Sequence, residues 1–253
     1  MINREKAARL GRPALTDEEI RRGRPSYIWQ FGQQRRLDLV KKYLSLKNKR
    51  ILDVGCGLGT YLKKFQEESP EVYGLDIDSE SIKEASKISS KVQLAKAEKL
   101  PYSSNFFHLV FMHEILEHLE DDKKAISEAL RVLKPKGNLV IFAPNRFWFF
   151  ETHGFFLGKK YIFRLLPFVN WLPAFIRNKF CPHVRIYTRR KLKKLFEDEN
   201  VEFRCWYYLY PGFDKITYRH PSLGKILRKI FYFLEKTPLQ IFGLSIFTIV
   251  KKK

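Results

Sequence analysis

The feature that most constrains this chain is a glycine-rich turn between a short apolar run and the start of a helical pattern. Residues 51–54 have the composition of a buried strand, and Gly55, Gly57 and Gly59 follow at alternate positions. Glycine allows the backbone to turn sharply and lets a ligand approach it closely. The next helix would direct its free N–H groups and the positive end of its dipole towards the turn. The junction therefore predicts an α/β sheet with a ligand site where strand meets helix.

An ordinary strand-to-helix turn could contain the same glycines, and two carboxylates favour a ligand site instead. Asp53 lies near the end of the strand, where it could accept a hydrogen bond from a cationic amine. Asp76 lies towards the end of a second strand pattern, residues 72–78, where a carboxylate can bind both hydroxyls of a ribose. The Gly-x-Gly-x-Gly spacing differs from the Gly-x-Gly-x-x-Gly of dinucleotide sites. The pair suits a nucleoside with a positively charged amino-acid tail.

With these residues the chain resembles the class I S-adenosylmethionine-dependent methyltransferases. The resemblance is close over residues 37–142 and looser afterwards, and later motifs such as the Leu-Lys-Pro-x-Gly stop at 133–137 follow in the family's order. It implies an α/β fold, with a Rossmann-like, seven-stranded, mostly parallel sheet and flanking helices. It also implies S-adenosylmethionine as the cofactor.

The resemblance implies how this cofactor is held. Asp53 and the glycine turn would bind the methionine tail, Asp76 the ribose, and the residues after the second and third strands the adenine. Lys96 stands where the family usually has Asp, so we expect backbone contacts to the adenine there. The residues assigned to the cofactor are Asp53, Gly55, Cys56, Gly57, Gly59, Asp76, Ile77, Ala97, Glu98 and His113.

His113 follows the predicted fourth strand, residues 106–112, at the edge where open α/β sheets place their chemistry. Beside the transferred methyl group, a histidine could act as the general base if the acceptor is a hydroxyl. Simple packing against the methionine moiety is the alternative. We assign His113 as the candidate catalytic residue.

Glu114, Glu117 and His118 form a Glu-x-x-Glu-His segment, which also resembles a segment of ubiquinone-pathway O-methyltransferases that is linked to a divalent cation. On a helix, the three side chains would share one face, so a metal cluster is sterically possible. Carboxylates at the positive end of a helix explain both glutamates without an ion. We therefore assign no metal.

The formal net charge of +21 is unevenly distributed along the chain. Residues 50–142 contain 13 Lys and Arg against 15 Asp and Glu, whereas the remainder contains 35 against 12. The predicted cofactor domain is nearly neutral and its appendages are strongly basic. Because of this separation, we expect the positive charge to serve the binding of a partner and not of the cofactor.

We expect four parts in the chain: a basic N-terminal arm and helix (1–36), the cofactor-binding core (37–146), an insert (147–186) and a C-terminal completion of the sheet (187–253). A helix is expected near residues 33–46. Tyr27 and Trp29 before it could line the methionine end, although packing on the sheet is the more common role of aromatics.

The insert after the fifth strand predicts a basic, aromatic and helical lid over the acceptor. Residues 159–196 contain 11 Lys and Arg, no Asp or Glu, and eight aromatic residues. Prolines interrupt its apolar positions, so it is too broken to span a bilayer, and its composition suits a helix in the headgroup region of an anionic membrane. A self-contained aromatic lid over a soluble small molecule and an RNA-binding surface are the alternatives. Charge is the only signal for RNA, because no base-amine methylation motif follows the fourth strand.

In the C-terminal part, Thr188 is expected to cap a helix, and the resemblance implies a last strand, residues 243–250, that inserts antiparallel between its neighbours. His183 and Arg185 precede this helix and could reach the acceptor or form a structural link. The three cysteines, at 56, 181 and 205, have no metal-ligand spacing. They predict a reduced protein in the cytoplasm. The charged N-terminus predicts no signal peptide.

The prediction for function is an S-adenosylmethionine-dependent methyltransferase. Its partner would be a small, apolar or lipid-linked acceptor, and it would act in the cytoplasm or peripherally at an anionic membrane surface. An RNA methyltransferase, or a non-catalytic cofactor-binding protein that associates with RNA or membrane, is the alternative. Nucleic acid is the less favoured partner.

Overall fold

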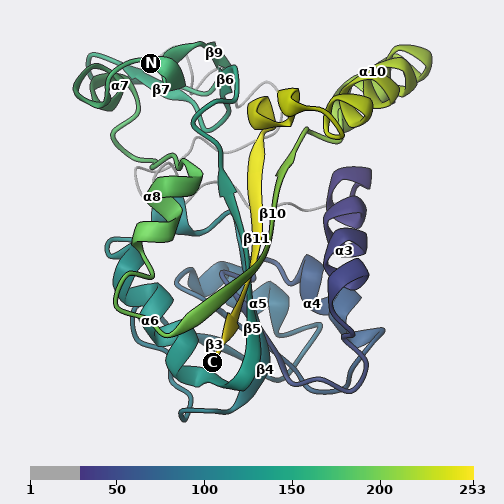
Figure 1. The fold of residues 1–253 in the computed structure, drawn as a ribbon, viewed down its shortest axis with the longest axis vertical. Helices are drawn as coiled ribbons and strands as arrows, with labels where there is room; N and C mark the ends of the chain where they lie inside the picture. Colours follow the sequence, from purple (N-terminus) through teal and green to yellow (C-terminus); the bar gives the residue numbers. More distant parts are fainter. Residues whose placement is uncertain (1–28) are drawn as a thin grey trace.

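The computed structural model describes residues 29–253 and is organised around a seven-stranded sheet (Figure 1). The strand order is β10-β11-β5-β4-β1-β2-β3, with β11 antiparallel to both neighbours and the other core strands parallel. This confirms the predicted fold class and the inserted last strand. The strands are β1 (Ile51–Val54), β2 (Val72–Asp76), β3 (Val92–Leu94), β4 (Phe107–His113), β5 (Leu133–Pro144), β10 (Val201–Leu209) and β11 (Ser245–Lys252).

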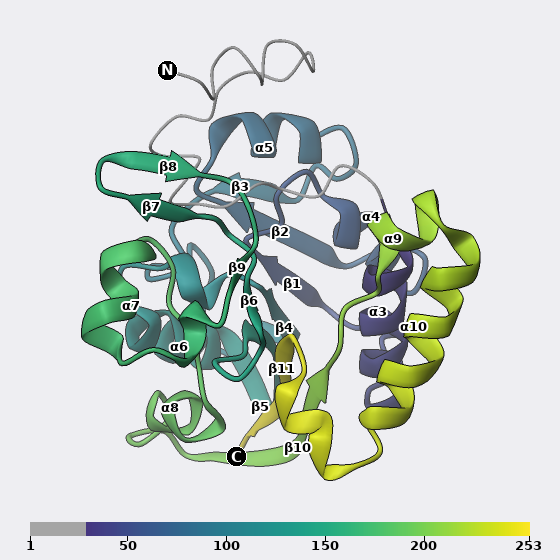
Figure 2. The same ribbon diagram turned by 90° about the horizontal axis from the view of Figure 1, so that it is seen from above.

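Helices cover both faces of the sheet, which explains why the central strands are apolar throughout (Figures 1 and 2). On one face, Leu37 of α3 and Leu62 of α4 enter the core, and on the other Ile126 of α6 and Leu192 of α8 do so. The helices are α3 (Phe31–Tyr43), α4 (Thr60–Gln66), α5 (Ser79–Ala85), α6 (Asp122–Val132), α8 (Arg189–Lys194), α9 (Asp214–Arg219) and α10 (Pro221–Leu234). The short helix α9 was not predicted, and α3 begins and ends earlier than expected.

Side-chain caps fix where two of these helices begin. Thr188 accepts a hydrogen bond from the backbone N–H of Lys191 at 3.1 Å, so the predicted cap of α8 is confirmed. Asp121 caps α6 in the same way, through the N–H of Lys124 at 2.9 Å. Each cap satisfies a donor that a helix start leaves without an intrahelical partner, and typically contributes about 1 kcal/mol.

The insert differs from its prediction, because short strands occupy as much of it as helical turns do. Two small antiparallel pairs form, β6 (Phe150–Glu151) with β9 (Leu166–Pro167), and β7 (Phe155–Leu157) with β8 (Lys160–Ile162). Only the 3₁₀ turn η2 (Val169–Trp171) and the seven-residue helix α7 (Ala174–Phe180) are helical. Gly154 and Gly158 have positive φ, at 86° and 59°, and such positions end regular helix. The prediction followed the basic and aromatic composition of the insert and gave too little weight to these glycines.

The insert, α10 and the 3₁₀ turn η3 (Pro238–Phe242) lie at one end of the molecule, where β4 and β5 end (Figures 1 and 2). No helix within residues 29–253 is both long enough and apolar enough to cross a bilayer. The fold thus brings the basic, aromatic segments to the edge of the sheet at which the sequence predicts the chemistry.

Candidate active site

The glycine turn adopts backbone conformations that side chains rarely allow. Gly55, Gly57 and Gly59 all have positive φ, at 75°, 51° and 81°. A Cβ atom on Gly55 would lie 2.1 Å from Cδ1 of Ile115. The N–H groups of Gly55 and Cys56 both donate to the carbonyl oxygen of Leu75, which ties the turn to the end of β2. The turn therefore depends on glycine for both its conformation and its space.

Two carboxylates border this turn at the ends of neighbouring strands. Asp53 is only 2% exposed, and burial followed by the negative charge of Asp76 raises its pKa to about 8. Burial also raises the pKa of Asp76, although its oxygens accept hydrogen bonds from the N–H groups of Gly57 and Asp78, both at 2.9 Å. A cationic group placed here would favour ionised Asp53.

The residues predicted to hold the adenine lie beyond β2 and β3. Ile77 is exposed beside Asp76, and Ala97 is buried. The Glu98 carboxylate accepts hydrogen bonds from the N–H groups of Glu120 and Asp121, at 3.1 and 3.4 Å. Its side chain therefore holds the loop before α6, which leaves its backbone for contact with a base.

These observations fit the cofactor that the sequence predicts. The buried Asp53 carboxylate suits the ammonium group of the methionine tail, and the bare glycine backbone suits a ligand that approaches closely. Asp76 retains acceptor capacity for ribose hydroxyls, since each carboxylate oxygen has two lone pairs. Of the aromatic residues predicted near the methionine end, Tyr27 lies outside the described residues. Trp29 stacks edge-on against Tyr61, with ring centroids 5.0 Å apart.

His113 ends β4 within a cluster of aromatic rings. Its ring centroid lies 4.9 Å from that of Tyr61 and 5.3 Å from that of Phe142. Burial, followed by the positive charge of Arg36, lowers the pKa of His113 well below its usual value. Its Nε2 atom is buried and has no hydrogen-bond partner among residues 29–253. His113 is therefore neutral near pH 7, which is the protonation state that a general base requires.

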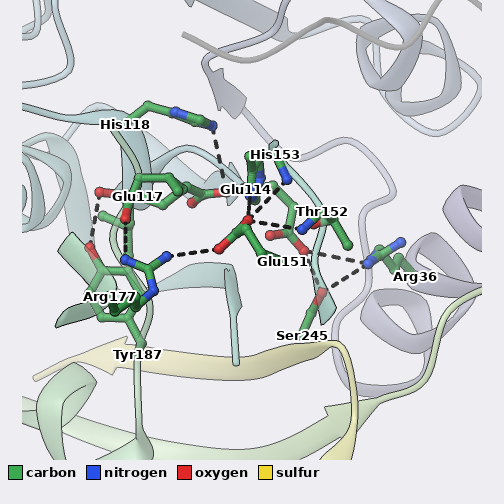
Figure 3. Close-up of polar contacts among 12 residues, drawn as sticks. Arg36, Glu114, Glu117, His118, Glu151, Thr152, His153, Arg177, Tyr187 and Ser245 are labelled. Atoms are coloured by element: carbon green, nitrogen blue, oxygen red, sulfur yellow. Dashed lines mark hydrogen bonds and ion pairs between the residues drawn. The ribbon is translucent and has the colours of Figure 1, made fainter. Parts of the chain in front are cut away.

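The shared helix face predicted for Glu114, Glu117 and His118 is wrong. Glu114 has a positive φ of 50°, and its carboxylate binds Arg36 and Ser245. Glu117 and His118 belong to a single 3₁₀ turn, η1 (Leu116–His118), and the charge of Glu114 acts on Glu117 from beside it (Figure 3). A helical explanation of both glutamates therefore fails, because no α-helix begins at this segment.

His153 from the insert joins Glu117 and His118 instead (Figure 3). One Glu117 oxygen lies 3.8 Å from Nε2 of His153 and 3.9 Å from Nε2 of His118, and the three donor atoms lie within 4.8 Å of one another. Burial, followed by the charge of Glu114, raises the pKa of Glu117 well above its usual value. Two imidazoles and a carboxylate are a donor set that could hold a divalent cation.

Glu151 anchors this group from the insert side. It accepts a hydrogen bond from the His153 ring at 2.9 Å and another from the buried Arg177 at 2.8 Å. Burial alone would raise the pKa of Glu151, but its contacts with His153 and Arg177 outweigh that effect and lower it to about 2. Sequence reasoning missed Glu151, His153 and Arg177, although an acidic residue and a histidine two positions apart in an otherwise basic insert was an available signal.

Arg185 forms a structural link between the segment before α8 and the loop before α6. Its guanidinium donates to the carbonyl oxygens of Leu119 and Glu120, the latter at 2.9 Å. His183 lies between the rings of Phe156 and Tyr161, with centroids 5.4 and 5.6 Å from its own. Of these two candidates, Arg185 therefore has the structural role.

The core of this chain is similar in sequence to known methyltransferases. Residues 52–141 match a family model described as a methyltransferase domain. An uncharacterized protein of Methanocaldococcus jannaschii is 38% identical over 44% of this chain, and the ubiquinone biosynthesis O-methyltransferase of Coxiella burnetii is 30% identical over 52%. This chain spans only about half of these relatives, 49% and 58% of their lengths. The demethylmenaquinone methyltransferase of Renibacterium salmoninarum is 25% identical over 79% of this chain and 81% of its own.

Solved structures share the fold at low sequence identity. An S-adenosylmethionine-dependent methyltransferase from Mesorhizobium loti has a TM-score of 0.57 and 16% identity, covering 85% of this chain and 96% of its own. The [4+2]-cyclase SpnF has the same TM-score with 20% identity, covering 91% and 84%. The chain therefore has the fold of the class I S-adenosylmethionine-dependent methyltransferases. Residues 52–141 also match a methyltransferase domain, for which S-adenosylmethionine is the implied cofactor.

Proposed function

We propose that this chain transfers a methyl group from S-adenosylmethionine to a small, apolar or lipid-linked acceptor at an anionic membrane surface. The bound cofactor supplies a methyl group already activated on its sulfonium. The observation that carries the proposal is the buried Asp53 carboxylate beside a turn of three positive-φ glycines, because burial of this acid is otherwise unfavourable.

In this proposal Asp53 binds the ammonium group of the cofactor, and Asp76 binds its ribose. Ile77, with the backbone of Ala97 and Glu98, contacts the adenine. His113 borders the methyl group and, being neutral, accepts a proton from an acceptor hydroxyl. Positioning supplies much of the remaining rate enhancement, since the methyl group needs no further activation.

Exposed apolar side chains among lysines support an apolar acceptor and a membrane surface. On the insert, Phe175 is 71% exposed and Lys179 lies one helical turn away. On α10 the exposed apolar residues recur every three or four positions, as in a single stripe, with Lys225 and Lys229 between them. These apolar residues are Leu223, Ile226, Ile230 and Phe233. Such surfaces are typical of helices that lie in the headgroup region.

The relatives indicate which acceptors to test first. Two of them are named for ubiquinone biosynthesis and for demethylmenaquinone. The test is to incubate the protein with cofactor labelled in its methyl group, and with separate quinone, lipid and RNA extracts. Label in the quinone or lipid fraction is expected, and Asp76→Ala, which removes the ribose contact, should abolish it. Transfer to RNA alone would support the alternative function, and no transfer together with unchanged cofactor affinity in Asp76→Ala would reject the enzyme assignment.

Membrane association has its own test. Co-sedimentation with vesicles that contain phosphatidylglycerol is expected, and with phosphatidylcholine vesicles it should be weak. A double variant, Ile226→Ser with Phe233→Ser, should bind the anionic vesicles several-fold less, because these side chains are exposed on α10. Equal binding of both proteins would exclude α10 as a membrane-binding surface.

A further inference from the structure

A cavity of about 1180 Å³ opens beside the carboxyl ends of β4 and β5, between the insert and the segment that precedes α8. Its wall includes Glu117 and His118, which follow β4, and residues of α7 from the insert. It is larger than most small-molecule pockets, which typically enclose about 300–1,000 Å³. The residues assigned to the cofactor and to catalysis do not line this cavity.

Positive charge dominates the wall of the cavity. Five of its lining residues are basic, namely Arg146, Lys159, Arg177, Arg185 and Lys191, and Glu117 is the only acidic one. The Glu117 carboxylate faces His118 and His153 and so does not approach these cations closely enough to form an ion pair. Basic side chains therefore line the cavity, and its other lining residues supply almost no negative charge to balance them.

Within residues 29–253, four of the five cations lack an ionic partner. Arg177 is paired with Glu151, whereas Arg146 and Arg185 donate to the backbone carbonyl oxygens of Leu172 and Glu120, at 2.7 and 2.9 Å. The ammonium of Lys191 donates to a backbone carbonyl at 3.3 Å, and Lys159 is exposed. A carbonyl oxygen accepts a hydrogen bond without neutralising the charge, so the positive potential remains in the cavity.

The charges that line the cavity act on one another. Burial lowers the pKa of Lys191, and the charges of Arg185, Arg177 and Arg146 lower it further against the opposing effect of Asp122. Apolar side chains complete the wall, among them Leu119, Phe156 and Ile186. A mixed wall of cations and apolar groups suits a ligand with an anionic group and an apolar body.

We propose that this cavity binds the phosphate, diphosphate or carboxylate group of the methyl acceptor. Arg146, whose guanidinium makes one hydrogen bond, offers donors to the oxygens of such a group, and Lys159 and Lys191 add charge. The assignment of the ligand as an acceptor rests on the proposed methyl transfer. The binding of an anion does not, because it can be measured without turnover.

The test is calorimetric titration of the full chain with inorganic diphosphate at physiological salt. Saturable binding is expected. The double variant Lys159→Gln with Lys191→Gln should weaken it at least about tenfold, because both lost charges line the cavity. The matched control, Lys160→Gln with Lys193→Gln, removes the same charge from neighbouring positions outside the cavity wall and should change the affinity less than about twofold. Thermal unfolding of each variant verifies that it is folded.

Three results would overturn the proposal: no saturable binding, equal weakening by both double variants, or competition by a short oligoribonucleotide that depends on the same two lysines. Equal weakening would indicate general attraction to a chain of net charge +21. Farnesyl diphosphate distinguishes the two sources of the anion. Affinity at least tenfold above that of inorganic diphosphate assigns a lipid-linked acceptor, and equal affinity assigns a free one. Anion binding without methyl transfer would leave the cavity assignment intact and reject only the proposed enzyme function.

Discussion

Two buried carboxylates near the edge of the sheet have opposite electrostatic environments. Asp53, 2% exposed, forms no ion pair within residues 29–253, and burial followed by the charge of Asp76 raises its pKa to about 8. Glu151, 1% exposed, binds Arg177 and His153, and its pKa falls to about 2. Both side chains are equally removed from water, so the partner decides the outcome. Glu151 is neutralised by the chain itself, whereas Asp53 is suited to a cation that arrives from outside.

The largest expected effect is on stability, at Glu151. Glu151→Gln leaves the buried guanidinium of Arg177 without its countercharge, and breaking such a pair typically costs about 3–5 kcal/mol. We expect chemical denaturation to show a loss of this size. Because its pKa lies below the unfolded value of 4.5, Glu151 stabilises the fold above that pH, and this contribution is lost as the pH falls through about 2.

Glu84→Gln is the control for that prediction. It removes an exposed pairing with Lys87, and such pairs contribute little, so the unfolding midpoint should hardly move. If the two variants were equally stable, the comparison between Asp53 and Glu151 would fail, because Glu151 would not need its buried partner.

Asp53→Asn is expected to change stability in the opposite direction and to weaken cofactor binding. The neutral amide removes the cost of ionising a buried acid, so the cofactor-free protein should unfold at a higher temperature near pH 8 and show a smaller gain near pH 5. Calorimetry should show at least about a hundredfold weaker affinity for S-adenosylmethionine, since the countercharge of its ammonium group is lost. A more stable variant with unchanged affinity would show that Asp53 does not bind the cofactor.

The same contrast explains which features the sequence could predict. Asp53, the three glycines and Asp76 lie within 24 residues, and alternating strand and helix patterns dictate that they meet. Glu117 and His153 come from different parts of the chain, and their meeting depends on how the insert folds back. The helical lid predicted there is only partly correct, because α7 is helical whereas β7 and β8 form a short hairpin around Gly158. Apolar spacing carries no information about such long-range contacts.

Glu117 is a third buried carboxylate, and neither of its oxygens has a hydrogen-bond partner among the described residues. We expect Zn²⁺ to bind at Glu117, His118 and His153, and a titration with Co²⁺ to give visible absorption bands. His153→Ala should weaken binding about a hundredfold, whereas Glu114→Gln, which removes the neighbouring charge that raises the pKa of Glu117, should not weaken it. Loss of metal binding in Glu114→Gln alone would indicate that Glu114, Glu117 and His118 hold the metal, as the sequence allows.

The smallest expected effect is the pH dependence of cofactor binding. With a pKa of about 8, Asp53 is mostly protonated at pH 7 in the cofactor-free protein. Binding the ammonium of S-adenosylmethionine requires the carboxylate, so binding should release a proton, and affinity should rise about threefold to tenfold from pH 6 to pH 7. Calorimetry in two buffers of different ionisation enthalpy measures the released proton directly. Asp53→Asn should release none, and an affinity that stays constant over this range in the unmodified protein would show that Asp53 is already ionised before the cofactor arrives.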